Sequence, residues 1–353
     1  MSKNLFIAST PFHLLTSFIL SNSMYAQDEN YLALVHPQGY DKWQENPVMK
    51  FMSSEAAGYA AVYPWPTLFT SKAKESLKAQ NKLLLEKMGE HNFSNVFAGV
   101  DNDPQIQMLI AALGHTEFYR YEDGLYSYYN ADRNRSVHHM LFHKLKIKIM
   151  CLLAGIPLGM YINTINQGSS KAGKADYMYM PQLLARYSPK TVEITKAMID
   201  QAMDKLAQAG LMEQKHVEGE YIYFLSQPVT NQGKISFEDE IAIIAKLVEE
   251  LQPNEKMVYK PHPNDSAHKL AYLQEHFPQL IYDASKEPIE VLLYREPLVK
   301  RVISYQTTTL ILAKKFTGRN IECVSLVNYY HQPLNNGYVK LMQDAGVIFP
   351  KKE

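Results

Sequence analysis

Short β-rich runs and helical stretches alternate along most of this chain. The run "NLFIAST" at residues 4–10 is followed by "PFHLLTSFILSN", whose apolar residues have helical spacing and whose Pro11 suits a first helical turn. The same succession returns several times in both halves of the sequence. Because strand–helix–strand units place their strands parallel, the pattern predicts an α/β fold built on parallel sheets.

The alternation is interrupted between about residues 163 and 220, and we expect the domain junction at the end of this region. The stretch "NTINQGSSKAGKADY" has the composition of a polar loop, and residues 189–211 have the pattern of one long amphipathic helix closed by Gly210. A chain of 353 residues also exceeds what one hydrophobic core usually serves. We therefore predict Rossmann-like domains at residues 1–215 and 216–330 and a helical tail at 331–353.

Composition favours small-molecule chemistry in a reducing compartment. The 36 basic and 36 acidic side chains cancel, which argues against broad electrostatic capture of nucleic acid. The two cysteines, Cys151 and Cys323, form neither a disulfide framework nor a metal-ligand spacing. Polar residues interrupt the apolar run at the N-terminus, so we expect no signal peptide and a cytoplasmic protein.

The most membrane-like stretch is "KLKIKIMCLLAGIPLGMYI". Residues 149–162 are apolar throughout, but 14 residues are too few to span a bilayer, and Pro157 interrupts them. A buried helix is the interpretation that we favour. The alternative is a basic surface helix that touches lipid, which leaves peripheral contact with the inner membrane open.

Polar residues follow many of the expected strands. Parallel α/β sheets bind ligands at the carboxyl ends of their strands, so chemistry should be sought there. In the first domain these residues are Ser9, Thr10, His36, Asp101, Asp103, Glu122 and Asp123, and in the second they are Gln227, His262, Asp283, Ser304 and Thr307 to Thr309.

The stretch "FYRYEDGLYSYYN" places two acids before a glycine at the end of an expected strand. Neighbours on a strand point to opposite faces, so at most one of Glu122 and Asp123 should reach a ligand directly. Alone, the tripeptide is typical of a turn, since Asp caps its own backbone and Gly124 accepts positive φ. The alternative is a general base in a partly dry pocket. The tyrosines that either wall such a pocket or pack in the core are Tyr119, Tyr121, Tyr126, Tyr128 and Tyr129.

His262 lies in "YKPHPND", where two prolines would hold the imidazole rigidly at the ligand edge of the second sheet. In "SYQTTTL", Ser304 and residues 307–309 lie between a strand and a helix. Hydroxyls and free backbone N–H groups at such a point form an anion-binding site, and a phosphate is the ligand that we expect there. Ordinary helix capping is the alternative for any single threonine.

Two further acidic groups have simpler explanations. "DND" at residues 101–103 superficially resembles a metal-binding Asp-x-Asp motif, but Asp103 before Pro104 has the pattern of a helix N-cap. Glu287 or Glu290 could bind a ribose, although acids in a first helical turn usually complement the helix dipole.

Three signatures in order resemble the bacterial sialyltransferases, including the polysialyltransferases and the lipooligosaccharide sialyltransferases. They are the acid-acid-Gly motif at Glu122, the His-Pro motif at His262, and a Ser/Thr pair motif that Thr307 and Thr308 fit best, although it reads "SYQTTTL" here. The opening "STPFHLLTS" is also similar to the Thr-Pro start of these enzymes.

The resemblance implies a GT-B fold with two Rossmann-like domains facing a cleft, a CMP-activated nonulosonic acid as donor, no metal, and inversion at the anomeric carbon. It implies that the motif carboxylate deprotonates the acceptor, with Glu122 the first choice and Asp123 the second, while His262 assists the departing phosphate. On this basis we assign the nucleotide side to Gln227, Lys260, His262, Pro263, Glu290, Ser304, Thr307 and Thr308, and the acceptor side to Ser9, Thr10 and Asp103.

These features together predict a cytoplasmic, metal-independent, inverting sialyltransferase. It would use CMP-sialic acid, without a further cofactor, to modify a cell-surface glycan such as lipooligosaccharide or capsule, with a terminal galactoside as the expected acceptor. The alternatives are a GT-B transferase for CMP-Kdo, CMP-pseudaminic acid or a UDP-sugar, and a non-catalytic protein that binds glycan or nucleotide.

Overall fold

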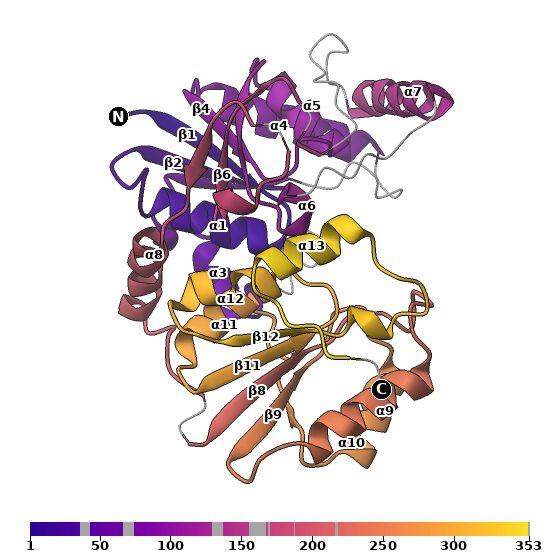
Figure 1. Ribbon diagram of the computed structural model, residues 1–353. Coiled ribbons are helices and arrows are strands. Elements are labelled where there is room, and N and C mark those ends of the chain that lie inside the picture. The colour runs from indigo at the N-terminus through magenta and orange to yellow at the C-terminus, as the bar shows by residue number, and fades with distance from the viewer. Residues whose placement is uncertain are drawn as a thin grey trace. The chain divides into compact units, whose positions relative to one another are not determined.

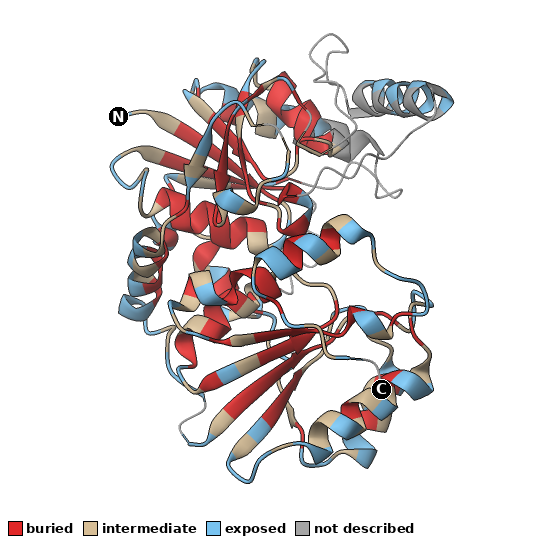
Figure 2. Ribbon diagram, in the orientation of Figure 1, coloured by how far each residue is buried: buried red, intermediate tan, exposed pale blue. Residues whose placement is uncertain are grey.

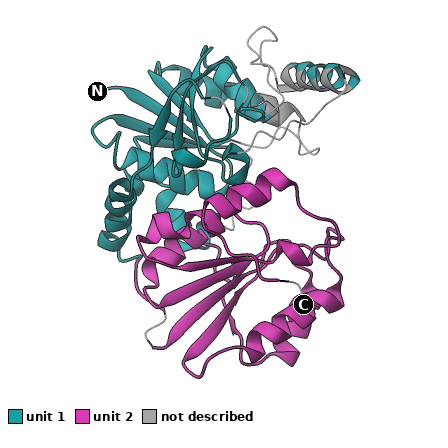
Figure 3. Ribbon diagram, in the orientation of Figure 1, with its two compact units in different colours: residues 1–211 teal, residues 212–353 magenta. Residues whose placement is uncertain are grey.

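The computed structural model describes residues 1–35, 43–65, 74–128, 137–154, 167–168, 170–186, 188–215 and 218–351. The chain divides into two compact units, Met1–Leu211 and Met212–Glu353 (Figure 3). This division lies four residues before the junction expected at residue 215. The second unit includes residues 331–353, for which the sequence predicted a separate helical tail.

The first unit contains a seven-stranded sheet in which all neighbouring strands are parallel, in the order β3-β2-β1-β4-β5-β6-β7. Figure 1 labels β1, β2, β4 and β6 of this sheet. Its strands are β1 (Lys3–Ala8), β2 (Glu29–Val35), β3 (Ala61–Trp65), β4 (Asn95–Ala98), β5 (Phe118–Tyr121), β6 (Gly173–Met178) and β7 (Thr191–Glu193). Its helices are α1 (Pro11–Ser21), α3 (Pro47–Met52), α4 (Lys74–Gly89), α5 (Pro104–Ala112), α6 (Leu125–Tyr128), α7 (Val137–Ala154) and α8 (Lys196–Gln208), with short 3-10 helices at Glu55–Ala57 and Pro181–Leu183.

Local capping explains where the early helices begin. The Thr10 hydroxyl accepts from the backbone N–H of His13, and Pro11 occupies the first turn of α1. The Asp103 carboxylate caps α5 in the same way before Pro104, so the N-cap predicted there is confirmed. Each helix is thereby fixed at the carboxyl end of the preceding strand.

Two predictions between residues 163 and 211 were wrong. All of β6 except Met178 lies inside the stretch expected to be a polar loop. β7 lies inside the expected long helix, which begins only at Lys196 after the capping residue Thr195. The polar appearance of β6 comes largely from Asp176. That side chain is fully buried because arginines neutralise it, and its strand pairs in parallel with both β5 and β7.

The prediction of a buried helix near residue 149 was also wrong for the part of the chain that the structure describes. In α7, the side chains of Ile149 and Leu152 are exposed at 49% and 68%. Residues 155–162 and His36 lie outside the described ranges. Within those ranges, no helix combines the length and the apolar character needed to cross a bilayer.

The second unit contains a five-stranded parallel sheet in the order β10-β9-β8-β11-β12. Its strands are β8 (Glu220–Leu225), β9 (Glu255–Lys260), β10 (Ile281–Tyr282), β11 (Val299–Ser304) and β12 (Glu322–Ser325). Its helices are α9 (Phe237–Glu249), α10 (Ala267–His276), α11 (Ile289–Arg295), α12 (Thr309–Thr317) and α13 (Asn336–Asp344), with a 3-10 helix at Val327–Tyr329.

Both cores are built on the central strands (Figure 2). Residues 4–8 of β1 are fully buried, and Phe6 stacks on Phe97 of the neighbouring β4 with ring centroids 4.6 Å apart. In the second unit, Phe224 of β8 stacks on Tyr259 of β9 at 5.5 Å. Buried central strands make rigid platforms, so the residues at their carboxyl ends are held in defined positions.

Candidate active site

Polar groups of the first unit follow three strands that are neighbours in its sheet. Ser9 comes directly after β1, Asp101 follows β4, and Glu122 and Asp123 follow β5. The strand order places β4 between β1 and β5. Because these strands are parallel, the four residues share one carboxyl edge of the sheet, where proteins of this class bind ligands.

The two acids after β5 have different surroundings. The Glu122 side chain is fully buried, and its Oε2 accepts hydrogen bonds from the Tyr128 hydroxyl and from the Tyr179 backbone N–H at 2.9 Å. The Asp123 side chain remains 19% exposed. Gly124, the next residue, has a φ of 93°, as the turn interpretation predicted. Since a general base must reach its substrate, burial favours Asp123 over Glu122 for that role.

His13 contacts the Asp123 carboxylate directly. Its Nε2 is hydrogen-bonded to Asp123 Oδ1, and its Nδ1 is hydrogen-bonded to the Ser9 hydroxyl at 2.9 Å. The imidazole is fully buried and meets the Tyr121 ring edge-on, with centroids 5.6 Å apart. A Cβ on Gly99 would lie 2.5 Å from His13 Nε2, so the absence of a side chain there permits this approach.

Asp123 is also held from the other side. Its Oδ2 accepts from Gln167 Nε2 at 2.8 Å, and its backbone N–H donates to the Ser127 hydroxyl at 2.7 Å. Both carboxylate oxygens therefore have a fixed partner. A carboxylate positioned in this way can accept a proton from a substrate hydroxyl without the entropy cost of first ordering its side chain.

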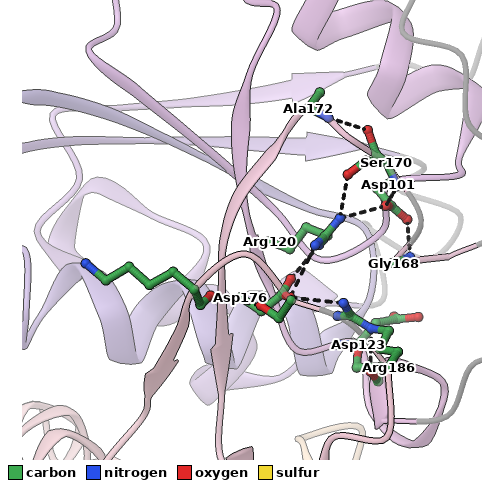
Figure 4. A network of polar contacts seen from close by, with 11 residues as sticks. Asp101, Arg120, Asp123, Gly168, Ser170, Ala172, Asp176 and Arg186 are labelled. Carbon is green, nitrogen blue, oxygen red and sulfur yellow. Dashed lines mark hydrogen bonds and ion pairs between the residues drawn. The ribbon is translucent and has the colours of Figure 1, made fainter.

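A buried ion-pair network supports this turn (Figure 4). Arg120 in β5 pairs with Asp176 in β6 and, at 3.3 Å, with Asp101 after β4. Arg186 donates to Asp176 at 2.9 Å and to the Ser127 carbonyl at 2.9 Å. Burial raises the pKa of Asp176, but the two arginines outweigh it and hold that pKa below its usual range. The network thus joins three strands to the segment that follows Asp123.

Asp101 extends the network to the loop that carries Gln167. Its carboxylate accepts from the backbone N–H groups of Gly168 at 2.7 Å and Ser170 at 3.1 Å. Gly168 has a φ of 75°, and a Cβ there would lie 2.5 Å from Arg186 Nε. Burial raises the pKa of Asp101, and Arg120 acts against this rise. Asp101 thereby positions a loop, and through it the Gln167 contact to Asp123.

Three neighbouring strands of the second unit also end in polar residues. His262 follows β9, Gln227 follows β8, and Thr307 follows β11. The strand order places β8 between β9 and β11. These residues therefore share the carboxyl edge of the second sheet.

The hydrogen bonds of His262 define its tautomer. Its Nδ1 accepts from the backbone N–H of Asn264 at 3.1 Å, so the proton of the neutral ring is on Nε2. Burial lowers the pKa of His262; the Asp265 carboxylate opposes this shift and the Lys269 ammonium adds to it. His262 is therefore a neutral imidazole at pH 7 that offers an Nε2–H donor.

A buried lysine organises the turn around His262. Lys269 Nζ pairs with Glu240 at 2.7 Å and Asp265 at 3.1 Å, and it donates to the Ser226 hydroxyl at 2.9 Å. Asp265 in turn accepts from the His262 backbone N–H at 2.9 Å. Burial raises the pKa of Glu240, although Lys269 opposes the rise. The His262 backbone is thus anchored to α9 and α10 through charged groups.

The hydroxyl groups after β11 have unequal surroundings. Ser304 is fully buried and its hydroxyl donates to the Leu225 carbonyl at 2.7 Å. Thr307 and Thr308 are half-buried at the beginning of α12, and the Thr307 hydroxyl donates to Thr309 at 3.4 Å. Thr309 donates to the buried Glu290 at 3.0 Å, and burial raises the pKa of this carboxyl. Thr307 and Thr308 are accordingly better exposed to a phosphate than Ser304.

The other residues expected on the nucleotide side differ in accessibility. Lys260 Nζ donates to the Ser285 carbonyl at 2.6 Å, and burial lowers the pKa of this ammonium. Gln227 is half-buried and Pro263 is exposed. Lys260 therefore stabilises a neighbouring loop. The side chains of Gln227 and Pro263 remain partly accessible to solvent at the carboxyl edge of the sheet.

The residues expected on the acceptor side have local partners. Ser9 is bonded to His13, Thr10 caps α1, and Asp103 caps α5 through the N–H groups of Gln105 and Ile106 at 2.8 and 3.2 Å. The structure brings Ser9 into the Asp123 cluster. Thr10 and Asp103 begin helices at the same edge.

Sequence reasoning missed His13, Arg120, Asp176, Arg186, Gln167 and Lys269. His13 lies inside the quoted stretch "STPFHLLTS", one helical turn after Ser9, and that spacing was its available signal. The others become visible only when strands far apart in sequence are paired. Of the tyrosines left open, Tyr121 and Tyr128 are buried core residues, Tyr126 is exposed, and Tyr129 lies outside the described ranges.

Within the described ranges, no group of three or more His, Cys, Asp or Glu side chains is placed so that it could hold a metal ion.

Solved structures show the fold class. The S. aureus MnaA–UDP co-structure is 12% identical, with a TM-score of 0.50, and the match covers 92% of this chain and 79% of that one. The Arabidopsis thaliana UGT89C1 complexed with UDP is 10% identical, with a TM-score of 0.50 and coverages of 98% and 83%. The predicted α/β fold of GT-B type, with two Rossmann-like units, is confirmed.

The sequence also matches a family model. No curated protein matches the chain. The model for alpha-2,8-polysialyltransferase (POLYST) matches residues 4–325, a range that includes both strand edges described above and all three motifs. The chain therefore belongs to the alpha-2,8-polysialyltransferase family and is a sialyltransferase-type glycosyltransferase.

Proposed function

We propose that this protein transfers a sialic acid from CMP-sialic acid to a hydroxyl group of a cell-surface glycan in the cytoplasm. The reaction inverts the configuration at the anomeric carbon and needs no metal ion. The observation that carries the proposal is the family match, which spans residues 4–325 and so takes in both candidate edges.

Asp123 acts as the base in this reaction. Its carboxylate takes the proton of the acceptor hydroxyl while that oxygen forms a bond to the anomeric carbon. His13 is a positioning residue, because it touches Asp123 rather than the substrate. The hydrogen bonds from Asp123 through His13 to Ser9 form a chain in which each bond polarises the next.

His262 assists the leaving group. As the bond from the anomeric carbon to the CMP phosphate breaks, its electron pair leaves with the phosphate oxygen. The Nε2–H of His262 donates a hydrogen bond to the charge that develops there. CMP departs as a stable anion, so the neutral imidazole suffices and need not lose its proton.

Thr307 and Thr308 bind the same phosphate. Their hydroxyls and the N–H groups at the beginning of α12 are an anion site of the kind that helix N-termini provide. Glu290 holds the adjacent Thr309 and so orients this segment. The first unit thus supplies the base and the second holds the nucleotide.

The acceptor is a sialoside in this proposal. The sequence motifs alone predict a terminal galactoside, but an alpha-2,8-polysialyltransferase extends an existing sialic acid, and this family is the one that the chain matches. Sialoside and galactoside acceptors are distinguished by the assay below.

The test is to incubate the purified protein with labelled CMP-N-acetylneuraminic acid, CMP-Kdo, CMP-pseudaminic acid and a UDP-sugar, with and without EDTA. Each donor is offered with sialoside and galactoside acceptors. We expect sialyl transfer to the sialoside, unchanged by EDTA, and stabilisation on heating by CMP but not by UDP or GDP. Stabilisation by CMP without turnover of any donor would reject the transferase and favour a nucleotide-binding protein.

A further inference from the structure

Helix α7 exposes large apolar side chains to solvent. The exposed fractions are 60% for Leu141, 69% for Phe142, 56% for Leu145, 49% for Ile149 and 68% for Leu152. A folded protein rarely leaves several large apolar residues of one helix in water unless that surface has a partner. The helix contacts α4 of its own unit, so it is joined to the sheet domain that carries Asp123.

The exposed apolar residues form one stripe. At 3.6 residues per turn, Leu141, Leu145, Ile149 and Leu152 with Phe142 fall within an arc of about 100°. We call this surface the α7 stripe. The exposed His138 lies in the same arc at the beginning of the helix.

Lysines border the α7 stripe on both sides. Lys144 and Lys148 lie next to one edge of the arc and Lys146 next to the other, and all three are exposed. The eighteen residues of α7 contain no aspartate or glutamate. An apolar stripe between lysines fits a surface that is apolar inside and negatively charged outside, which is the interface of an anionic bilayer.

We propose that the α7 stripe inserts into the interface of an anionic lipid bilayer while Lys144, Lys146 and Lys148 bind its headgroups. A second copy of this chain fits less well. Pairing of two stripes would bring the lysines of both copies together, and juxtaposed like charges oppose association. The proposal does not rest on the transferase reaction, because it needs neither donor nor acceptor.

The test measures binding of the full chain to vesicles of phosphatidylcholine with and without phosphatidylglycerol, at low and high salt. We expect binding only to the anionic vesicles, weakened by salt. Reversal of the three lysines in K144E/K146E/K148E should lower the affinity about a hundredfold. Leu145→Ser replaces an apolar residue in the middle of the α7 stripe by a polar one, so it should also weaken binding at both salt concentrations.

The matched control reverses three exposed lysines outside α7, K50E/K190E/K351E, and so gives the same net charge. Its vesicle affinity should stay within about threefold of the original protein. Equal losses in both triple variants would overturn the proposal, as would binding that ignores vesicle charge. Absence of vesicle binding together with a dimer that L145S dissociates, seen by sedimentation, would assign the stripe to a second copy instead. Turnover of a water-soluble acceptor is assayed in parallel, so a failed transferase proposal and a failed lipid proposal are distinguishable.

Discussion

His13 and Asp123 are hydrogen-bonded to each other although 110 residues separate them in the sequence. The contact joins the first helix of the chain to the acid-acid-Gly motif. It leaves Asp123 at the surface of the carboxyl edge, while Glu122 is enclosed by Tyr128 and Tyr179. The proposed base is therefore the second acid of the motif, and the first acid builds the turn that presents it.

The two motif acids should respond differently to neutralisation. Asp123→Asn should lower kcat by roughly a hundredfold or more, because the base is lost, while the melting temperature changes little. Glu122→Gln weakens two buried hydrogen bonds to a charged acceptor, so it should lower the unfolding free energy by about 1–3 kcal/mol. Steady-state kinetics and urea unfolding separate these effects.

The reverse result would return the base to Glu122, the first choice from the family motif. That result is a near-normal kcat in Asp123→Asn together with a large loss in Glu122→Gln at unchanged stability.

Gly99 permits the contact between His13 and Asp123. Gly99→Ala places a methyl group where the imidazole now lies, with the Cβ 2.5 Å from Nε2, so the ring must move. We expect kcat to fall at least about tenfold, with KM for the donor less affected, because the change acts on the base. Gly89→Ala is the matched control, since no atom lies within 4 Å of the added carbon.

A double variant decides whether the effect passes through His13. The three atoms nearest to the added carbon all belong to the His13 ring, so in a His13→Ala background Gly99→Ala should cause little further loss of kcat. Additive losses would show that Gly99 acts by another route.

Most of the fold could be predicted because its strands and helices have regular local patterns. The second unit is the clearest case, since the alternation of short β-rich runs and helical stretches indicated its parallel sheet. β6 was not predicted, because an aspartate such as Asp176 is typical of a loop. Its burial is explained only by Arg120 and Arg186, which neutralise its charge. A charge that is neutralised by distant residues cannot be recognised as buried from local sequence alone.

The candidate site was predictable only in part. Strand ends and motifs located Asp123, His262 and Thr307, because ligand sites of parallel sheets lie at such ends. They could not choose between Glu122 and Asp123. That choice depends on the partners Tyr179 and His13, which are brought together by the strand order β1-β4-β5-β6.

The tautomer of His262 makes a prediction about its replacements. The amide nitrogen of a glutamine reaches about the position of Nε2, whereas that of asparagine reaches about the position of Nδ1. His262→Gln should therefore keep a donor towards the phosphate and retain more kcat than His262→Asn, and His262→Ala should lose roughly a hundredfold. If Asn restores turnover better than Gln, the donor is not on Nε2.

The lowered pKa of His262 also gives a direction for pH. Burial favours the neutral ring of His262 in the folded protein. Below about pH 6.5 the unfolded chain therefore binds more protons at this residue than the folded protein does. The contribution of His262 to stability is complete above that pH and is lost as the pH falls towards the lower folded pKa. Urea unfolding at pH 5 to 8 should show this slope in the original protein and a smaller slope in His262→Gln. Equal slopes in both proteins would contradict the assignment.

Lys269 should stabilise the second unit out of proportion to its single charge. Lys269→Met leaves Glu240 and Asp265 buried without their cation, so it should lower the unfolding free energy by about 3–5 kcal/mol. Adding Glu240→Gln removes one of the two buried charges that have lost their cation and should recover part of the lost unfolding free energy. Lys340→Met removes an exposed lysine and should change stability by less than about 0.5 kcal/mol.

Because Asp265 also holds the His262 backbone, Lys269→Met should weaken stabilisation by CMP as well. A variant that loses stability yet binds CMP normally would separate the Lys269 network from the nucleotide side.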